Sequence, residues 1–389
     1  MKKEIECDKI SSIEKIVNSS IHLFAKRWYS SVSIAEICRK AKVSNGLFYH
    51  YFSDKENLIK YILDKIVSDI EKMLQKIDGK DLYEKISNLA NSMLDYTTKN
   101  KELILVFREG QYRYFEYERK LYKIYSDTLK RILNKNIPLS LYVYTFGGLR
   151  WICIRKALYD IDISIDDTIN IILKGIFNNL DFNLNNILTL PIKFPDISYP
   201  VNSKDRLIDA GKSIFGQKEY YEVNIYNITE KANLAVGSFY NYFKSKHLFF
   251  EHLVEVSGKQ IRHFISENLS FDFNRLETEL RGIFLFLNYL KFDKNCYNIV
   301  REAEFVSPKK AREYYESFVK GYKKMNYSFI EKNNYPKSKL YLNTVIEFLL
   351  GISHYFGIEY IFDNNNIDLF QTLNRLGNLL KKGLEGEDL

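Results

Sequence analysis

The chain has 389 residues and a mass of 46.1 kDa, with 46% hydrophobic residues and a formal net charge of +8. This length suits two or three domains, and the hydrophobic fraction excludes a chain that stays disordered. The basic excess permits an anionic partner without requiring one, because a chain this long can carry it on ordinary solvated faces.

Several function classes lack their sequence signals. The four cysteines are widely spaced with no C-x-x-C pair, which indicates neither a disulfide framework nor a zinc site and favours a reducing cytoplasm. The six histidines have no metal-ligand spacing, and no nucleophile elbow or phosphate loop occurs. We therefore expect no enzyme activity and no cofactor. The sequence also shows no signal peptide and no membrane span.

Helical spacing dominates the chain. Only 17 Gly and 6 Pro interrupt it, and apolar residues recur every three or four positions without sustained alternation. The pattern predicts an all-α fold. A first helix is expected from about Ser12 to Lys26, with Ile16, Val17, Ser20, Leu23 and Phe24 on its buried side.

The next stretch, Ser33 to Lys55, holds two short helices and a sharp turn. Ser33 with Glu36, and Ser53 with Glu56, fit the S-x-x-E capping box that marks a helix start. Ser44 follows a break too short for anything but a turn between crossing helices, and it is placed to cap the second one.

That second helix, from Asn45 to about Phe52, is short and aromatic. Phe48 and Phe52 lie one turn apart and are expected in the core. The positions left on the outside are Asn45, Leu47, Tyr49 and His50. This pattern suits a recognition helix, which lies in the DNA major groove.

The run I-A-x-x-x-x-A-x-V-S-x-G-x-F-Y-x-Y-F-x-x-K-x-x-L over these residues resembles the DNA-binding domain of the tetracycline-repressor (TetR) family. The resemblance implies a three-helix helix-turn-helix domain that binds a double-stranded DNA operator. It implies phosphate contacts by Tyr49 and Lys55, with Ser33 offering the N-terminus of its helix to another phosphate. The candidate base-reading residues are Ser44, Asn45, Leu47 and His50.

A helical bundle is expected after this domain, reading from about Leu82 to Asn179. By resemblance it binds a ligand and mediates dimerisation, and its last two helices, in the run GGLRWICIRKALYDIDISIDDTINIILKGI, form the dimer interface. Residues Thr189 to Asn202 then carry three prolines and cannot continue a helix, so they predict a linker.

Beyond the linker the pattern repeats. An offset of 191 carries Phe24 to Phe215, Gly46 to Gly237 and Phe48 to Phe239 without a gap. The match continues more weakly downstream. Arg108-Glu109 corresponds to Arg301-Glu302 at an offset of 193, and Gly148 corresponds to Gly351 at an offset of 203. The chain is therefore predicted to contain two TetR-like modules in tandem.

The second copy keeps the phosphate anchors and changes the base readers. Tyr240 and Lys246 are retained, and Asn224 replaces the capping serine. The reading positions become Ala235, Val236, Ser238 and Asn241. We expect the modules to read unlike half-sites, or the second to have weak specificity. One chain could supply both recognition helices as an intramolecular pseudo-dimer, and a homodimer stays open.

Together these patterns predict a boundary for each domain. The expected domains are 1–58 (helix-turn-helix 1), 59–188 (bundle 1), 189–202 (linker), 203–249 (helix-turn-helix 2) and 250–389 (bundle 2).

Aromatic residues are frequent in the two bundles, where core filling explains most of them. Some could line a pocket for an apolar or aromatic effector. Candidate ligand-binding residues are Phe107, Arg108, Tyr112, Trp151, Arg301, Phe305 and Tyr355. For the pairs Arg108-Glu109 and Arg301-Glu302, surface or inter-helix ion pairing is favoured over a polar group in a ligand pocket.

The predicted function is a cytoplasmic transcriptional regulator released from DNA by a small-molecule effector. A repressor is favoured, and activation stays open. The alternative is an effector-sensing or partner-docking helical protein in which one or both DNA-binding domains have decayed. The apolar pair Ala235 and Val236 favours that alternative for the second copy, whereas Tyr240 and Lys246 oppose it.

Overall fold

The computed structural model describes residues 2–195, 202–333, 338–362 and 367–386, which form helices and loops with no strand. The predicted linker, 189–202, lies partly outside these residues. Contacts between Cα atoms divide the chain into two units, Met1–Asn134 with Cys153–Asp160, and Lys135–Ile152 with Ile161–Leu389. Within the described ranges, no helix combines the length and the apolar character that a membrane crossing needs.

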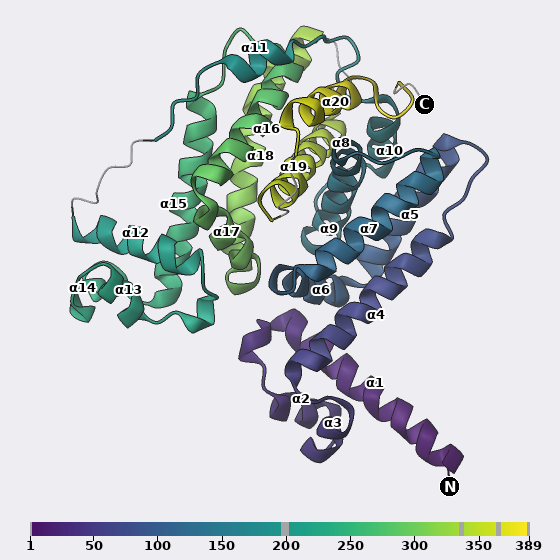
Figure 1. The fold of residues 1–389 in the computed structure, drawn as a ribbon, viewed down its shortest axis with the longest axis vertical. Helices are drawn as coiled ribbons and strands as arrows, with labels where there is room; N and C mark the ends of the chain where they lie inside the picture. Colours follow the sequence, from purple (N-terminus) through teal and green to yellow (C-terminus); the bar gives the residue numbers. More distant parts are fainter. Residues whose placement is uncertain (1, 196–201, 334–337, 363–366, 387–389) are drawn as a thin grey trace. The chain divides into compact units, whose positions relative to one another are not determined.

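The first unit contains the helices drawn in purple to blue in Figure 1. They are α1 (Lys2–Lys26), η1 (Tyr29–Ser31), α2 (Ile34–Ala41), α3 (Asn45–Tyr51), α4 (Lys55–Gln75), α5 (Leu82–Lys99), α6 (Lys101–Arg113) and α7 (Glu116–Leu133). The apolar side of α4, formed by Leu58, Ile62, Ile66 and Ile70, is buried as its spacing predicts. The α4 helix packs against α6 and α7.

Two local predictions in this unit need correction. The first helix begins at Lys2, not near Ser12, because a helix needs no cap residue where good helix formers continue the chain. The cap of α4 is Asp54, not Ser53: the Asp54 carboxylate accepts from the Asn57 amide at 2.7 Å. A carboxylate at the helix N-terminus also interacts favourably with the helix dipole, so Asp54 is the better cap.

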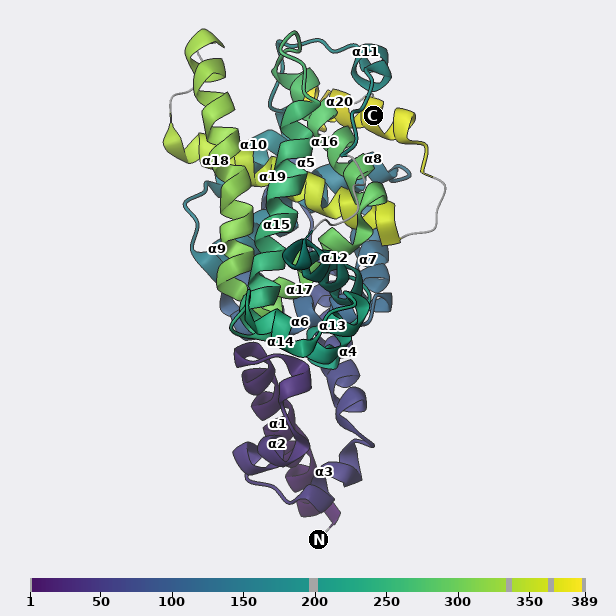
Figure 2. The same cartoon turned by 90° about the vertical axis from the view of Figure 1, so that its left-hand side faces the viewer.

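The second unit holds the remaining helices, and α9 (Gly148–Tyr159) contributes to both units. Its members are α8 (Leu139–Tyr142), the π-helical turn η2 (Val143–Gly147), α10 (Ile165–Lys174), α11 (Leu184–Thr189), α12 (Ser203–Phe215), η3 (Tyr220–Glu222), α13 (Ile225–Lys231), α14 (Val236–Tyr240), α15 (Lys246–Glu267), α16 (Arg275–Phe292), α17 (Lys294–Val306), α18 (Pro308–Asn333), α19 (Lys339–Phe362) and α20 (Leu369–Lys382). Figure 2 shows α15 and α18 running alongside each other, with α19 crossing α18.

Closing helices of both modules pack together inside this unit. The helices α8, η2 and α10 of the first module contact α19 and α20 of the second. A Cβ atom added to Gly351 would lie 3.1 Å from the Cα atom of Gly148, its equivalent at an offset of 203. The same offset relates Trp151 to His354, whose ring centroids lie 4.8 Å apart. Equivalent residues that meet each other mark a two-fold axis, here an approximate one.

The ends of α10 and α20 repeat this symmetry. The Ile176 amide donates to the Leu380 carbonyl at 2.7 Å, and the Leu384 amide donates to the Ile172 carbonyl at 3.0 Å. An offset of 208 interchanges the two bonds. Each helix ends at a glycine with positive φ, Gly175 at 80° and Gly383 at 64°, where only glycine lets the backbones approach so closely.

The two contact-based units do not coincide with the domains predicted from the sequence. The predicted boundaries follow the repeat along the sequence, whereas the units group helices by contact. Residues 135–152 and 161–188 belong to the predicted first bundle and are grouped with the second module, because they pack against its closing helices. The boundaries themselves remain predictions.

Candidate nucleic-acid interface

The two helix-turn-helix segments share one local architecture. Ser33 caps α2 in a complete capping box with Glu36, whose pKa falls to about 2 because its carboxylate accepts from the Ser33 amide. Asn224 caps α13 in the equivalent box with Asn227. The turn residues Lys42 and Asn233 both adopt left-handed φ, at 56° and 53°. The repeat in the sequence is therefore a repeat in backbone conformation.

Both recognition helices bury the aromatic residues that were predicted for the core. Phe48 and Phe239 are fully buried, at 0% exposure, and Phe52 and Phe243 are nearly so. Tyr49 and Tyr240 lie next to them and are each 56% exposed. Both tyrosine side chains are thus open to solvent at the same place in the two copies, and their contact with DNA remains a prediction.

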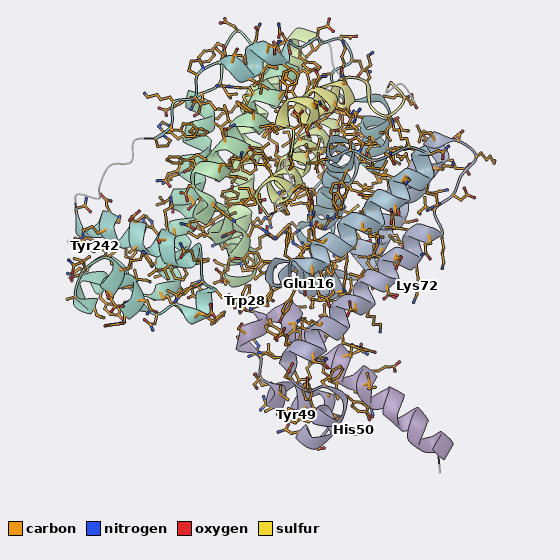
Figure 3. The ribbon with its side chains drawn as sticks, in the orientation of Figure 1. Trp28, Tyr49, His50, Lys72, Glu116 and Tyr242 are labelled. Atoms are coloured by element: carbon orange, nitrogen blue, oxygen red, sulfur yellow. The ribbon has the colours of Figure 1, made fainter. Side chains whose placement is uncertain are left out.

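The predicted reading residues lie on this exposed side. Figure 3 places Tyr49 and His50 on the outer side of α3. All the predicted reading residues have side chains at least partly open to solvent: Ser44, Asn45, Leu47, His50, Ala235, Val236, Ser238 and Asn241. The structure thus brings each predicted set together on its own helix, and contact with bases remains a prediction.

Lys55 and Lys246 hold their domains together. The Lys55 ammonium donates to the carbonyls of Tyr29 and Val32, at 2.9 and 2.7 Å. The Lys246 ammonium makes the same two bonds to Tyr220 and Val223, at 2.9 and 2.8 Å. Burial lowers the pKa of both lysines. Each ammonium also lies over a tyrosine ring, Lys55 at 4.4 Å from the Tyr29 centroid and Lys246 at 4.2 Å from the Tyr220 centroid. Contact of these lysines with phosphate remains a prediction.

Each helix-turn-helix is also bonded to its own bundle through a buried glutamate. Glu109 on α6 accepts from the Tyr29 amide at 2.9 Å, and Glu302 on α17 accepts from the equivalent Tyr220 amide. Glu109 also lies 3.6 Å from the Arg113 guanidinium. The acids of the two Arg-Glu pairs thus connect bundle and DNA-binding domain, a role that the sequence did not reveal because the partner is a backbone amide about 80 residues away.

The copies differ at the start of the recognition helix. The Ser44 hydroxyl accepts from the Leu47 amide at 3.1 Å, but Ala235 offers no side-chain cap, and α14 has five residues where α3 has seven. Losing a serine cap costs about 1 kcal/mol of helix stability. The second recognition helix is therefore the less firmly held of the two.

Three cations beside the turn were not predicted from the sequence. Arg39 and Lys40 are exposed in the last turn of α2, and Lys42 is exposed at its C-cap. Their equivalents in the second copy are Glu230, Lys231 and Asn233, which carry no net charge. The run R-K-A-K was the available signal. At these three positions the first module carries the larger positive charge, which favours phosphate contacts there.

A cavity of about 460 Å³ opens inside the second unit, a size typical of small-molecule sites. Of the seven candidate ligand residues, Trp151 lines it. The other six lie outside its lining and remain predictions; they are Phe107, Arg108, Tyr112, Arg301, Phe305 and Tyr355. Tyr355 is buried with its ring 4.2 Å from the Arg150 guanidinium.

Two curated relatives match part of the chain. The Transposon Tn10 TetC protein of Escherichia coli is 30% identical over 100 residues, which are 25% of this chain and 51% of the relative. The uncharacterized HTH-type transcriptional regulator YvdT of Bacillus subtilis is 27% identical over 128 residues, which are 32% of this chain and 66% of the relative. The chain thus spans about half to two thirds of the length of these relatives.

Two solved structures give partial superpositions. The regulator FadR from Bacillus subtilis, in complex with stearoyl-CoA, has a TM-score of 0.40 and 20% identity, covering 46% of this chain and 98% of FadR. A TetR family transcription regulator from Marinobacter aquaeolei has a TM-score of 0.36 and 17% identity, covering 44% of this chain and 95% of that protein.

The profile of the family described as "Bacterial regulatory proteins, tetR family" matches the chain twice. The matches cover residues 16–62 and 207–253, which are the two helix-turn-helix segments at an offset of 191. They agree with the repeated caps, aromatic cores and lysine contacts described above. The chain therefore contains two helix-turn-helix segments of the tetR-family type, arranged in tandem.

Proposed function

We propose that this protein is a sequence-specific DNA-binding transcriptional regulator in which one chain supplies both recognition helices. The observation that carries the proposal is the reciprocal exchange between Ile176 and Leu380 and between Leu384 and Ile172. Homodimeric interfaces have this two-fold pattern. Here both halves come from one chain, which therefore forms an intramolecular pseudo-dimer with domains as predicted from the repeat.

The unlike recognition helices favour an asymmetric operator. The first module offers Asn45, Leu47, His50 and the cations Arg39, Lys40 and Lys42, whereas the second offers Ala235, Val236, Ser238 and Asn241. Base-edge contacts give specificity and phosphate contacts give affinity. The first module is therefore expected to select the sequence, while the second adds contacts through Tyr240 and Lys246.

We expect a small-molecule effector to release the protein from DNA. The protein would then act as a repressor in the cytoplasm, and activation of transcription remains the alternative. An effector that fits one bundle conformation better than another shifts the population toward it. The glutamates Glu109 and Glu302 provide a connection by which a shift of α6 or α17 reaches a helix-turn-helix.

A second candidate function is an effector sensor whose second DNA-binding domain has decayed. The uncapped five-residue α14 favours it. It differs from the first in predicting that Tyr240 and Lys246 have no effect on DNA affinity.

Salt dependence of DNA binding tests the proposal. Labelled duplex from the region upstream of the protein's own gene is titrated at several salt concentrations. For six to ten phosphate contacts the affinity should fall roughly 10³- to 10⁵-fold between about 50 and 200 mM salt. Absence of binding at low salt, to this duplex and to a random genomic pool, would contradict the proposal.

A further inference from the structure

One wall of the cavity in the second unit is formed by a residue of the first module, Trp151 on α9. The rest of the lining comes from α15 and the segment after it, and from α16, α17, α18 and α19. The Trp151 indole nitrogen donates to the Glu347 carboxylate at 2.8 Å, which fixes the ring. Its centroid lies 4.9 Å from that of Tyr315 and 4.8 Å from that of His354. Anything bound against this wall contacts both modules.

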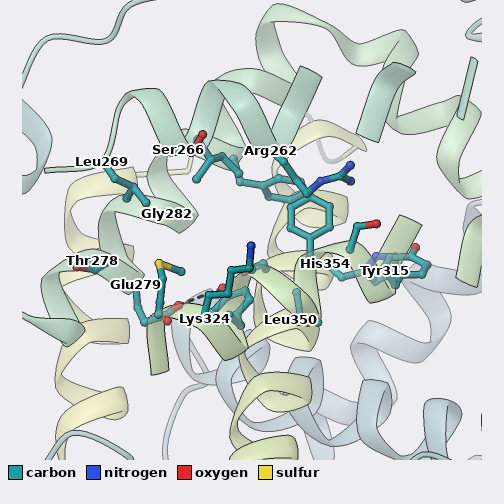
Figure 4. A pocket seen from close by; sticks show the side chains of 18 of the residues that line it. Arg262, Ser266, Leu269, Thr278, Glu279, Gly282, Tyr315, Lys324, Leu350 and His354 are labelled. Carbon is teal, nitrogen blue, oxygen red and sulfur yellow. Dashed lines mark hydrogen bonds between the residues drawn. The ribbon is translucent and has the colours of Figure 1, made fainter. Parts of the chain in front are cut away.

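The charges around the cavity indicate what it would bind. Glu279 is buried, and its carboxylate already pairs with Arg275 and accepts from the Tyr322 hydroxyl at 3.1 Å. Arg262 and Lys324 also line the cavity, so its formal charge is positive. Figure 4 shows the Lys324 side chain directed into the space between Ser266 and Glu279. Most of the remaining surface is aromatic or aliphatic.

We propose that this cavity binds an apolar molecule with one anionic group, and that the ligand contacts Trp151, so that one ligand bridges the two modules. The anionic group lies near Lys324, and the apolar body lies against Trp151 and Tyr315. Attraction between opposite charges orients the ligand, while burial of its apolar surface supplies most of the affinity. The identification of this cavity as the effector site rests on the proposed function.

A connection leads from this wall to the second helix-turn-helix. The Tyr315 hydroxyl donates to Glu304 on α17 at 2.6 Å. Glu302, on the same helix, accepts from the Tyr220 amide. A ligand that displaces Tyr315 therefore acts on the helix that holds the second DNA-binding domain, and through Trp151 it acts on α9 of the first module.

Tryptophan fluorescence tests the proposal without DNA. The chain has two tryptophans, so Trp28→Phe leaves Trp151 as the only tryptophan, and it is excited at a wavelength that the 30 tyrosines do not absorb. The probes are decanoate, decan-1-ol and decylammonium, which share one apolar chain and differ in head-group charge. Decanoate should change the emission saturably, and it should bind at least about tenfold more tightly than decan-1-ol and more tightly still than decylammonium. Lys324→Met should remove the preference for decanoate over decan-1-ol.

Two glycines supply matched controls for the site. A Cβ atom at Gly282 or Gly321 meets no atom within 4 Å, and both residues line the cavity. Gly282→Phe should fill the space and abolish the response, whereas Gly282→Ala should preserve it. Gly321→Phe tests the same point from α18 if Gly282→Phe does not fold. If Trp28→Phe does not fold, calorimetric titration of the unmodified protein with decanoate measures binding instead.

Three outcomes would overturn the proposal. They are no decanoate binding by either method, decanoate binding that leaves Trp151 emission unchanged or survives both phenylalanine variants, and equal affinity for decylammonium. Because no DNA is present, these results are separate from the salt titration: failure to bind DNA would overturn the proposed function and leave the ligand result standing.

Discussion

Gly351→Ala is expected to lower the free energy of unfolding by about 3 kcal/mol, the upper end of overpacking effects. The new Cβ atom would lie 2.5 Å from the Trp151 Cβ and 2.6 Å from the Gly147 carbonyl oxygen. Neither atom belongs to the flexible end of a side chain, so the crossing helices must separate. Urea denaturation of the purified protein measures the change.

The matched control is the same substitution at Gly282. Its Cβ meets no atom within 4 Å, and alanine is the better helix former by up to about 1 kcal/mol. Gly282→Ala should therefore be neutral or stabilising. If Gly351→Ala proves as stable as Gly282→Ala, the close contact at the approximate two-fold axis is not part of the folded protein.

Tyr49→Ala is expected to weaken DNA binding by roughly 10- to 150-fold with little change in stability. Loss of a hydrogen bond to a charged group costs about 1.5–3 kcal/mol, and an exposed substitution changes stability by at most about 0.5 kcal/mol. Because tyrosine carries no charge, the slope of affinity against salt should stay unchanged. Fluorescence anisotropy with labelled duplex measures both quantities.

Two other tyrosines make this test selective. Tyr83 on α5 is 55% exposed, nearly as much as Tyr49, and lies in the bundle, so Tyr83→Ala should leave DNA binding unchanged. Tyr240→Ala should weaken binding in the same direction as Tyr49→Ala if both modules contact DNA. Equal affinities of the Tyr49 and Tyr83 variants would contradict the assignment of the first interface. Lysine variants are less informative, because Lys55 also bonds to two carbonyls of its own domain.

The helix-turn-helix segments could be predicted because their determinants are local. A cap at Ser33 or Ser44 and a buried Phe48 one turn before Phe52 depend on residues within four positions of each other. The choice of Asp54 over Ser53 was missed because both residues can cap a helix and only the backbone direction decides between them.

Contacts over long sequence distances could not be predicted in the same way. The offset of 203 made Gly148 and Gly351 equivalent, but only the fold shows that they meet. Trp151 was predicted as a candidate ligand-binding residue. The sequence did not reveal that it lines a cavity formed mainly by the second module, because the contact of α9 with the closing helices of that module leaves no periodic pattern in the sequence.

The mass of the protein–DNA complex tests the pseudo-dimer most directly. Sedimentation velocity of the unmodified protein with labelled duplex gives the number of chains bound. A complex of one 46.1 kDa chain per duplex is the expected result, because one chain already contains both halves of the symmetric interface. Two chains per duplex at every protein concentration would show instead that recognition helices are paired between molecules.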